Sequence, residues 1–453
     1  MSQPAAPAKG HPRGLYLLFT VEMWERFSYY GMRAILVLFM TKALLFDTKM
    51  AGNIYGWYTG LVYLTPLIGG YLADRYLGAR RCITIGAIVM AFGEFSLAAS
   101  AFMPHDAAAG GAAGFGLPTV LFYLGLVALI FGNGFFKPNI STTVGKLYDQ
   151  NDPRRDGAFT IFYMGINLGA FFSPIICGTL GERVAWGYGF LAAGIGMLAG
   201  LLVYWWGQDR FLGDAGMRPG MAPRAKGEEQ QAPMTTEEKH RIAVIFIMAF
   251  FVIFFWASFE LAGSALTLFA DRSTDRMIPF INWEFPASWF QSVNPLLIFI
   301  LAPFFSTMWI RLARASREPS TPMKFVTGLG LLTLGMVLMV LASAILQSSG
   351  AERVSWLWLA GCYLFCTLGE LCLSPVGLSM VTKLAPVRFV SLLMGTWFGA
   401  NFVANLVSGL FAGQYDAMTK TQFFMIPVAT AGGATLILLF LVKPLRKWMH
   451  GIH

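Results

Sequence analysis

The sequence predicts an all-α polytopic membrane protein whose twelve transmembrane helices form two six-helix bundles. Hydrophobic residues make up 56% of the 453 residues and charged residues only 13%, whereas roughly 25% of a soluble globular domain is charged. Apolar runs recur along the whole chain, and about 20 helical residues are enough to cross the hydrocarbon core of a bilayer. One long polar stretch divides these runs into two equal sets.

Twelve segments are long and apolar enough to span a membrane. They cover roughly 14 to 44, 53 to 73, 82 to 103, 118 to 143, 157 to 181, 186 to 207, 241 to 270, 286 to 310, 323 to 348, 354 to 382, 389 to 413 and 422 to 442. The polar stretch after the sixth segment is rich in Pro, Gly and charge, which is typical of a flexible linker. We therefore expect an N-terminal bundle over 1–207, a cytoplasmic linker over 208–240 and a C-terminal bundle over 241–453.

The basic residues predict the orientation. Lys and Arg are concentrated in the two terminal tails and the even-numbered loops, and they are sparse in the odd-numbered loops. Cytoplasmic loops of membrane proteins carry such an excess. Both termini are therefore expected in the cytoplasm, with the helices in a plasma membrane, most simply a bacterial inner membrane. The net charge of +9 belongs to these loops, so we expect no nucleic-acid partner.

The usual ingredients of enzyme chemistry are missing from the predicted spans. All five histidines fall in loops or tails, so a histidine metal site inside the membrane is not expected. The spans contain no paired aspartates and no serine with histidine. We expect neither an enzyme nor a cofactor nor a metal.

The first span carries an unusual polar stripe. At 100° per residue, an arc of about 100° holds most of its polar side chains: Glu22, Glu25, Arg26, Tyr29 and Arg33, with Tyr30 beside them. An ionised group at the bilayer centre costs a few kcal/mol, so this stripe indicates a cavity. The alternative is a set of ion pairs made for helix packing alone.

Further polar groups lie within later spans. Lys137 precedes a proline in the fourth span, and snorkelling to the interface is the alternative to burial in a cavity. Glu260 and Glu370 lie in the seventh and tenth spans. Asn167 and Asn294 are ligand candidates, although a membrane asparagine equally joins helices.

These groups suit recognition of a zwitterion. Arg26 and Lys137 can bind a carboxylate, Glu370 can bind an ammonium group, and the asparagines can bond amides between them. Opposite poles at a fixed separation select a short molecule that is charged at both ends. A different substrate such as nitrate or a glycoside, and a receptor or scaffold role, remain as alternatives.

Two motifs resemble those of the proton-dependent oligopeptide transporters, a branch of the major facilitator superfamily. EMWERFSYY, from Glu22 to Tyr30, matches that family's helix 1 signature ExxERFxYY, and FYMGINLGAFFSP, from Phe162 to Pro174, resembles its helix 5 signature. GGYLADRYLGARR, from Gly69 to Arg81, looks like the superfamily's loop between helices 2 and 3. Further agreement is found at Tyr63, Lys137, Trp256, Glu260, Asn294, Glu370, Ser374 and Trp397.

The resemblance implies the major facilitator fold and a proton-coupled symporter that imports di- and tripeptides by alternating access, working as a monomer. It implies that the peptide C-terminus is received by Arg26, Tyr30 and Lys137, and the N-terminus by Asn167, Asn294 and Glu370. It implies side-chain pockets lined by Tyr29, Tyr63, Trp256 and Trp397, with Ser374 as a further substrate-binding position.

The resemblance also implies how protons are coupled to gating. The implied set is Glu22, Glu25, Arg26, Lys137 and the pair Arg33 with Glu260. Two departures from the family pattern stand out: Leu261 follows Glu260 where the family commonly has glutamine, and the linker has no room for the two extra helices of many bacterial members.

Overall fold

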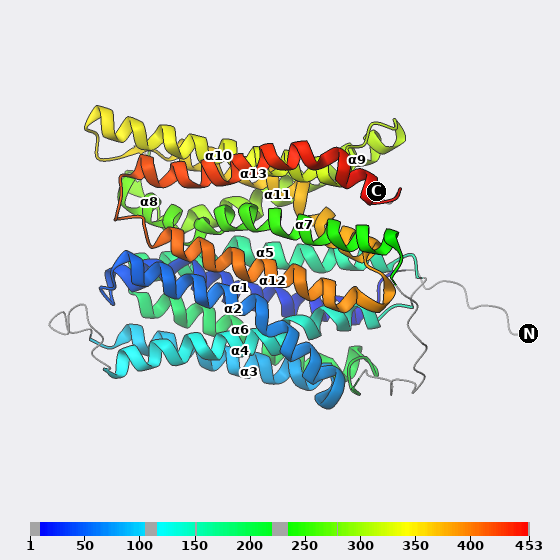
Figure 1. The fold of residues 1–453 in the computed structure, drawn as a ribbon. Helices are drawn as coiled ribbons and strands as arrows, with labels where there is room; N and C mark the ends of the chain where they lie inside the picture. Colours follow the sequence, from blue (N-terminus) through cyan, green and yellow to red (C-terminus); the bar gives the residue numbers. More distant parts are fainter. Residues whose placement is uncertain (1–9, 105–115, 150–151, 220–233, 279, 452–453) are drawn as a thin grey trace, which may run out of the picture.

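The computed structural model is almost entirely helical, and its long helices run roughly parallel to one another across the molecule (Figure 1). It describes residues 10–104, 116–149, 152–219, 234–278 and 280–451. The first half comprises α1 (Arg13–Lys42), α2 (Thr48–Leu72), the π-helical turn η1 (Ala73–Leu77), α3 (Ala79–Phe102), α4 (Leu117–Lys146), α5 (Arg155–Arg183) and α6 (Trp186–Phe211).

The second half contains one interrupted span, from α7 to α8, and one span, from η4 to α9, that begins with a 3₁₀ turn. Its elements are α7 (Thr236–Phe259), η3 (Glu260–Gly263), α8 (Ala265–Ser273), η4 (Ala287–Ser292), α9 (Val293–Arg314), α10 (Thr321–Ser349), α11 (Trp356–Leu384), η5 (Val387–Phe389), α12 (Val390–Ala412) and α13 (Lys420–Trp448). When α7 to α8 and η4 to α9 are each taken as one segment, the described residues form twelve long helical segments, the number predicted. Nine of these twelve are long and apolar enough to cross a membrane by length and composition alone.

Among the described residues, short strands occur only in the loops between helices. β1 (Thr274–Asp275) pairs in parallel with β4 (Val354–Ser355). β2 (Met277–Ile278) pairs antiparallel with β3 (Trp283–Glu284). These pairs tie the connections of the second half together, and the hydrophobic core remains between helices.

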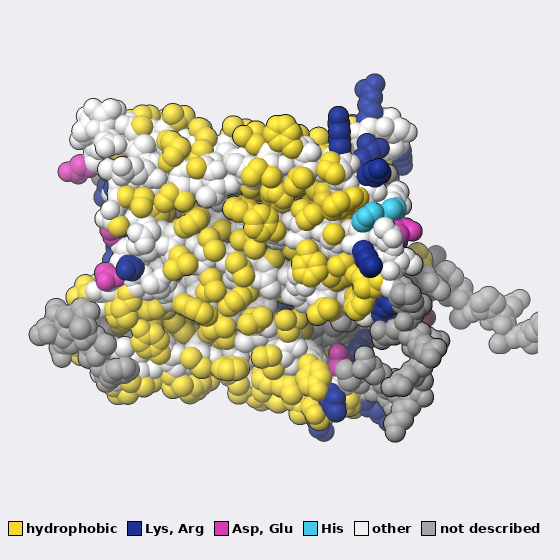
Figure 2. All heavy atoms as spheres, in the orientation of Figure 1, with side chains coloured by type: hydrophobic (Ala, Val, Ile, Leu, Met, Phe, Trp, Pro, Cys, Tyr) yellow, Lys and Arg dark blue, Asp and Glu magenta, His cyan; other side chains and the backbone are white. Residues whose placement is uncertain are grey.

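Charge and apolar surface are separated along the helix direction. Figure 2 shows hydrophobic side chains across the middle of one face and charged side chains toward its two ends. Most of the Lys and Arg visible there lie at the end that carries the C-terminus. We call this the terminal end and the opposite one the distal end. Residues 220–233, in the middle of the predicted linker, lie outside the described residues.

Arg80 fixes the described start of the linker at the terminal end. Its Nε donates to the carbonyl of Ala215 at 2.9 Å, and its Nη1 lies 3.1 Å from Asp209 Oδ1. The first turn of α3 therefore holds the chain that leaves α6.

The seventh span breaks where the sequence predicts one continuous helix. α7 ends at Phe259, a 3₁₀ turn begins at Glu260, and the chain resumes as α8 after Ser264. A Cβ atom at Gly263 would lie 1.7 Å from the hydroxyl oxygen of Tyr55. Only glycine therefore lets α2 approach the break this closely.

Glycines also set the separation of neighbouring helices. A Cβ at Gly56 of α2 would lie 2.8 Å from the Cα of Gly409 in α12, across the two halves. A Cβ at Gly69 of α2 would lie 2.0 Å from the carbonyl oxygen of Gly134 in α4. Small residues allow such backbone contacts between membrane helices.

We expect Gly69→Ala to lower the thermal stability of the protein in detergent, because backbone atoms of α4 cannot move aside like the end of a flexible side chain. Overpacking of this kind typically costs about 1–3 kcal/mol. Gly433→Ala is the matched control, since nothing lies within 4 Å of its added Cβ in the interior of α13. Equal unfolding temperatures for the two variants would contradict the close contact.

Candidate functional site

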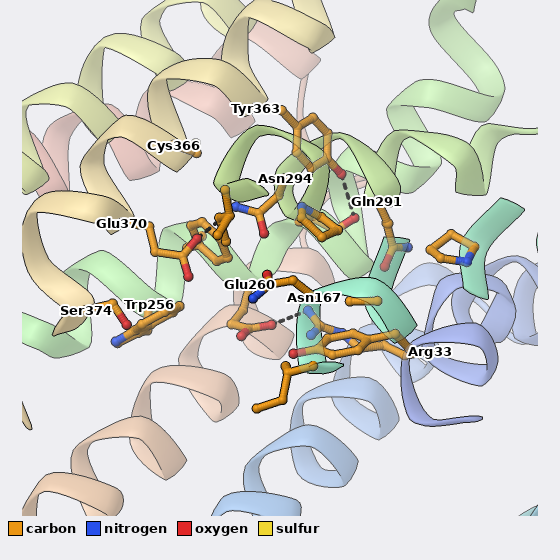
Figure 3. Close-up of a pocket in the computed structure, with 18 of the residues that line it drawn as sticks. Arg33, Asn167, Trp256, Glu260, Gln291, Asn294, Tyr363, Cys366, Glu370 and Ser374 are labelled. Carbon is orange, nitrogen blue, oxygen red and sulfur yellow. Dashed lines mark hydrogen bonds and ion pairs between the residues drawn. The ribbon is translucent and has the colours of Figure 1, made fainter. Parts of the chain in front are cut away.

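A cavity of about 200 Å³ lies between the two halves. Both halves line it: α1, α2 and α5 on one side, and α7, η3, α8, η4, α9 and α11 on the other. Figure 3 shows polar side chains from both halves pointing into it. This volume is below the roughly 300–1,000 Å³ of typical small-molecule pockets, so only a short ligand fits this conformation.

Glu370 provides a carboxylate at the second-half side of the cavity. Asn294 Nδ2 donates to Glu370 Oε2 at 2.8 Å and to the Thr367 hydroxyl at 3.0 Å. Among the described residues, no basic side chain lies within ion-pair distance of Glu370. Trp256 and Ser374 line the same cavity (Figure 3). The carboxylate is therefore oriented by an amide and left without a counter-ion.

Arg33 and Glu260 join the two halves at the cavity. The Arg33 Nη2 group donates to Glu260 Oε2, and Arg33 Nε donates to the Tyr55 hydroxyl at 2.5 Å. Both charged side chains are buried. The break of the seventh span at Glu260 places this carboxylate opposite α1, so the predicted contact between Arg33 and Glu260 is present (Figure 3).

A second charged cluster lies inside the first half. Arg26 Nη2 donates to Glu25 Oε1 at 2.5 Å, and Arg26 Nε lies 3.5 Å from Glu22 Oε1. Lys137 Nζ donates to Glu22, and Asn133 Nδ2 donates to Glu25 at 3.3 Å. Two acids and two bases thus form a compact, formally neutral cluster that joins α1 to α4.

Nine predicted site residues line the cavity. They are Tyr30, Arg33, Tyr63, Asn167, Trp256, Glu260, Asn294, Glu370 and Ser374. The other six, which do not line it in this conformation, are Glu22, Glu25, Arg26, Tyr29, Lys137 and Trp397.

Each of the residues outside the cavity has a physical reason for its position. The four charged residues neutralise one another in the first-half cluster. Tyr29 is buried under Arg26, whose guanidinium carbon lies 4.9 Å from its ring centroid. Trp397 packs edge-on against Phe325 of α10, with ring centroids 6.3 Å apart.

Sequence reasoning missed several cavity residues. Tyr163, Gln291, Tyr363 and Cys366 also line it. Tyr163 lies four residues before Asn167, and Cys366 lies four before Glu370. Residues four apart share a helix face, so this spacing was an available signal for both.

No group of three or more metal-ligating side chains occurs among the residues that the structure describes. The carboxylates of the site are instead engaged by arginine, lysine and asparagine. The chemistry available to the site is therefore ionic and hydrogen-bonded binding.

The distal end is closed by a further contact between the halves. Thr48, at the start of α2, donates its hydroxyl proton to Asp416 in the loop after α12, and Arg272 Nη1 lies 2.9 Å from Asp416 Oδ1. Burial alone raises the pKa of Asp416, but the hydrogen bonds from Thr48 and Arg272 outweigh it and lower the pKa below its ordinary value. Asp416 therefore stays ionised in mildly acidic solution.

Comparison with known proteins shows which family the chain belongs to. A model described as POT family matches residues 80–217 and 223–430, which is most of the chain. The chain belongs to the POT family. It is a membrane transporter, and the prediction that it is not an enzyme is confirmed.

Relatives in the POT family match almost end to end. A peptide transporter of Yersinia enterocolitica named YePEPT is 36% identical, covering 97% of this chain and 96% of its own. A di-/tripeptide transporter of Lactococcus lactis subsp. cremoris is 33% identical, covering 97% of each.

Solved structures of the POT family share the fold. A crystal structure of peptide transporter POT in complex with sulfate has a TM-score of 0.87 at 33% identity, covering 99% of this chain and 98% of that one. A POT family transporter in complex with 5-aminolevulinic acid has a TM-score of 0.86 at 30% identity, covering 98% of each. The predicted major facilitator fold is confirmed.

Asp416→Asn is expected to weaken the contact of Asp416 with Thr48 and Arg272, and so to open the distal end, to the same extent at about pH 7 and about pH 5. A lowered folded pKa means that the stabilisation is present above the ordinary pKa and is lost only when the pH falls through the folded value, below both test conditions. Distances between spin labels at Leu117→Cys and Glu352→Cys, which lie on opposite halves, measure the opening. A loosening seen at pH 7 and absent at pH 5 would show that Asp416 titrates in this range.

Proposed function

We propose that this POT family member imports di- and tripeptides by proton-coupled symport. The observation that carries the proposal is the Glu370 carboxylate, which lines the central cavity, is oriented by Asn294, and has no basic partner among the described residues. An ionised carboxylate at such depth is costly unless a cation pairs with it. The ammonium group of a peptide N-terminus supplies that cation.

The first-half cluster supplies the opposite pole. Arg26 and Lys137 are both held by glutamates, so a peptide carboxylate has to compete with Glu22 and Glu25 for them. A proton on either glutamate removes one competitor and releases a base to the substrate. Proton and peptide then favour the same state, which is the thermodynamic requirement for symport.

The Arg33–Glu260 pair is the proposed gate. A proton on Glu260 removes the charge that holds Arg33 and weakens a contact between the halves at the cavity. The two halves can then rock about the site, as in alternating access. The membrane potential contributes about 2.3 kcal/mol per charge per 100 mV, which is sufficient to drive concentrative uptake.

The orientation completes the proposal. The basic terminal end in Figure 2 supports cytoplasmic termini in a bacterial inner membrane. The proposed cytoplasmic linker, 208–240, includes the last residues of α6, which ends at Phe211, and the first residues of α7, which begins at Thr236. The distal end then faces the outside and is closed in this conformation. The monomer is the proposed functional unit, and the two halves of this chain supply both walls of the cavity.

The relatives support the substrate class. The Lactococcus relative is named a di-/tripeptide transporter, and a POT structure with a TM-score of 0.86 holds alafosfalin. A nitrate or glycoside substrate would leave the Glu370 charge without a partner.

Uptake of a labelled dipeptide into proteoliposomes under an imposed pH gradient tests the proposal. Accumulation above the external concentration, abolished by a protonophore, is expected. Binding without accumulation would instead support a receptor, and absence of both would refute peptide transport.

Glu370→Gln should weaken binding of free-amine dipeptides by roughly 10- to 100-fold, because a charged hydrogen bond contributes about 1.5–3 kcal/mol. An N-acetylated dipeptide is the matched ligand control and should bind both proteins equally. Calorimetry on the purified proteins measures both affinities. An affinity for the free-amine peptide within twofold of the parent's would place the N-terminus elsewhere.

Glu260→Gln should abolish accumulation while peptide counterflow persists. Glutamine keeps the size and hydrogen bonding of the acid but cannot carry its charge, so it mimics a permanently protonated gate. Glu94→Gln is the control: Glu94 is buried outside the cavity, where Ser28 donates to it at 3.1 Å. A monodisperse Glu260→Gln protein that still accumulates peptide would remove Glu260 from the coupling path.

A further inference from the structure

The helix that begins the eighth span has no cap of its own. Together, η4 and α9 form a continuous helix of 28 residues from Ala287 to Arg314. Its N-cap residue is Pro286, whose side chain cannot accept a hydrogen bond, and its first turn contains no acidic residue. The first backbone N–H groups of a helix lack partners within the helix and are costly when left buried without one.

Glu182 supplies this cap from the other half of the molecule. It lies at the last turn of α5. Its Oε2 accepts from the backbone N–H of Ala287 at 2.8 Å, and its Oε1 accepts from that of Ser288 at 2.9 Å. A carboxylate at this position satisfies two unpaired donors and interacts favourably with the positive end of the helix dipole.

The Glu182 cap is largely shielded from water. The Glu182 side chain is only 8% exposed, and Arg276 Nη1 of the second half lies 4.0 Å from Glu182 Oε2. Burial strengthens hydrogen bonds to an ionised group because water competes less for them. Loss of the carboxylate therefore affects two buried N–H groups at once.

Neighbouring hydrogen bonds extend the contact along α5. Trp289 Nε1 donates to the Thr179 hydroxyl at 2.9 Å, and the Ser292 hydroxyl donates to the carbonyl of Phe171 at 2.7 Å. We call this set, with the Glu182 cap, the α5–η4 seam. The seam is separate from the Arg33–Glu260 pair, because it joins α5 to η4 rather than α1 to η3.

We propose that Glu182 is a positioning residue that holds the distal end closed by capping a helix of the opposite half. The two backbone donors belong to η4 and the acceptor to α5, so the cap exists only while the halves are together at this end. Separation of the halves exposes both N–H groups and the carboxylate. The cap thus stabilises the outward-closed conformation relative to the outward-open one.

The α5–η4 seam also connects closure to the substrate cavity. Asn294, which orients Glu370, lies two turns after Ala287 on the same helix. Because Glu182 holds the start of this helix, it also fixes the position of Asn294 along the helix axis relative to Glu370. A role of this connection in transport rests on the alternating access proposed above. The closure of the distal end by Glu182 can be tested without a peptide.

Spin-label distances in lipid nanodiscs, without peptide, test the proposal. Labels at Leu117→Cys and Glu352→Cys report on the two halves at the distal end; Leu117 is 60% exposed, Glu352 is exposed, and the five native cysteines are buried. Glu182→Ala should raise the ratio of the long-distance to the short-distance population by about tenfold, which corresponds to about 1.4 kcal/mol. Glu182→Gln, which keeps one acceptor oxygen, should produce a smaller rise in the same direction.

Asp275→Ala is the matched control. Asp275 is an exposed acid at the same end whose Oδ1 accepts from the backbone N–H of Met277 at 3.1 Å, within its own half. The control should leave the distance distribution unchanged. An unchanged distribution in Glu182→Ala, or an equal shift in Asp275→Ala, would overturn the proposal. If Glu182→Ala is not monodisperse, Glu182→Gln is measured instead. Unchanged distances in Glu182→Gln would then overturn the proposal.

Discussion

Arg33 and Glu260 lie in the membrane-spanning region of opposite halves, where each charge is costly unless it has a partner. Their pairing requires that α1 and the seventh span meet at one place. The helix breaks at Glu260 to present the carboxylate, and Gly263 leaves room for Tyr55, which also binds Arg33. Helix geometry, the glycine and the tyrosine all follow from the need to neutralise one buried arginine.

The remaining charges follow the same requirement in different ways. The first-half cluster is neutral without any ligand, because two acids meet two bases. Among the described residues, Glu370 accepts a hydrogen bond from Asn294, which also donates to Thr367, and it forms no ion pair. The charges of the first-half cluster therefore balance one another, whereas the charge of Glu370 is balanced only when a cation enters the cavity or the acid is protonated.

The sequence predicted what depends on local periodicity and composition. Twelve spans follow from apolar length, and the polar stripe of α1 follows from helical spacing, so Arg33 could be placed on a cavity-facing side. The break after Phe259 was not predicted, since the groups that meet it, Arg33 and Tyr55, lie more than 200 positions earlier in the chain. Glu182 was missed for a similar reason: its partners are backbone groups, which leave no signature in the side chains near it. The family resemblance implied a side-chain pocket at Trp397, but in this conformation Trp397 packs against Phe325 and does not line the cavity.

The contact of α2 with α12 through Gly56 and Gly409 bears on kinetics. Backbone meets backbone at these two glycines, so no interlocked side chains have to change rotamer there when the two helices slide or roll past each other. Repacking therefore adds little to the activation barrier at this contact. One turn further along α2, the Phe402 ring of α12 packs over Gly60 and against Trp57. The larger share of the barrier to exchange between conformations then falls to the contacts that have to break, such as the Arg33–Glu260 ion pair and the packing of Phe402 on Trp57.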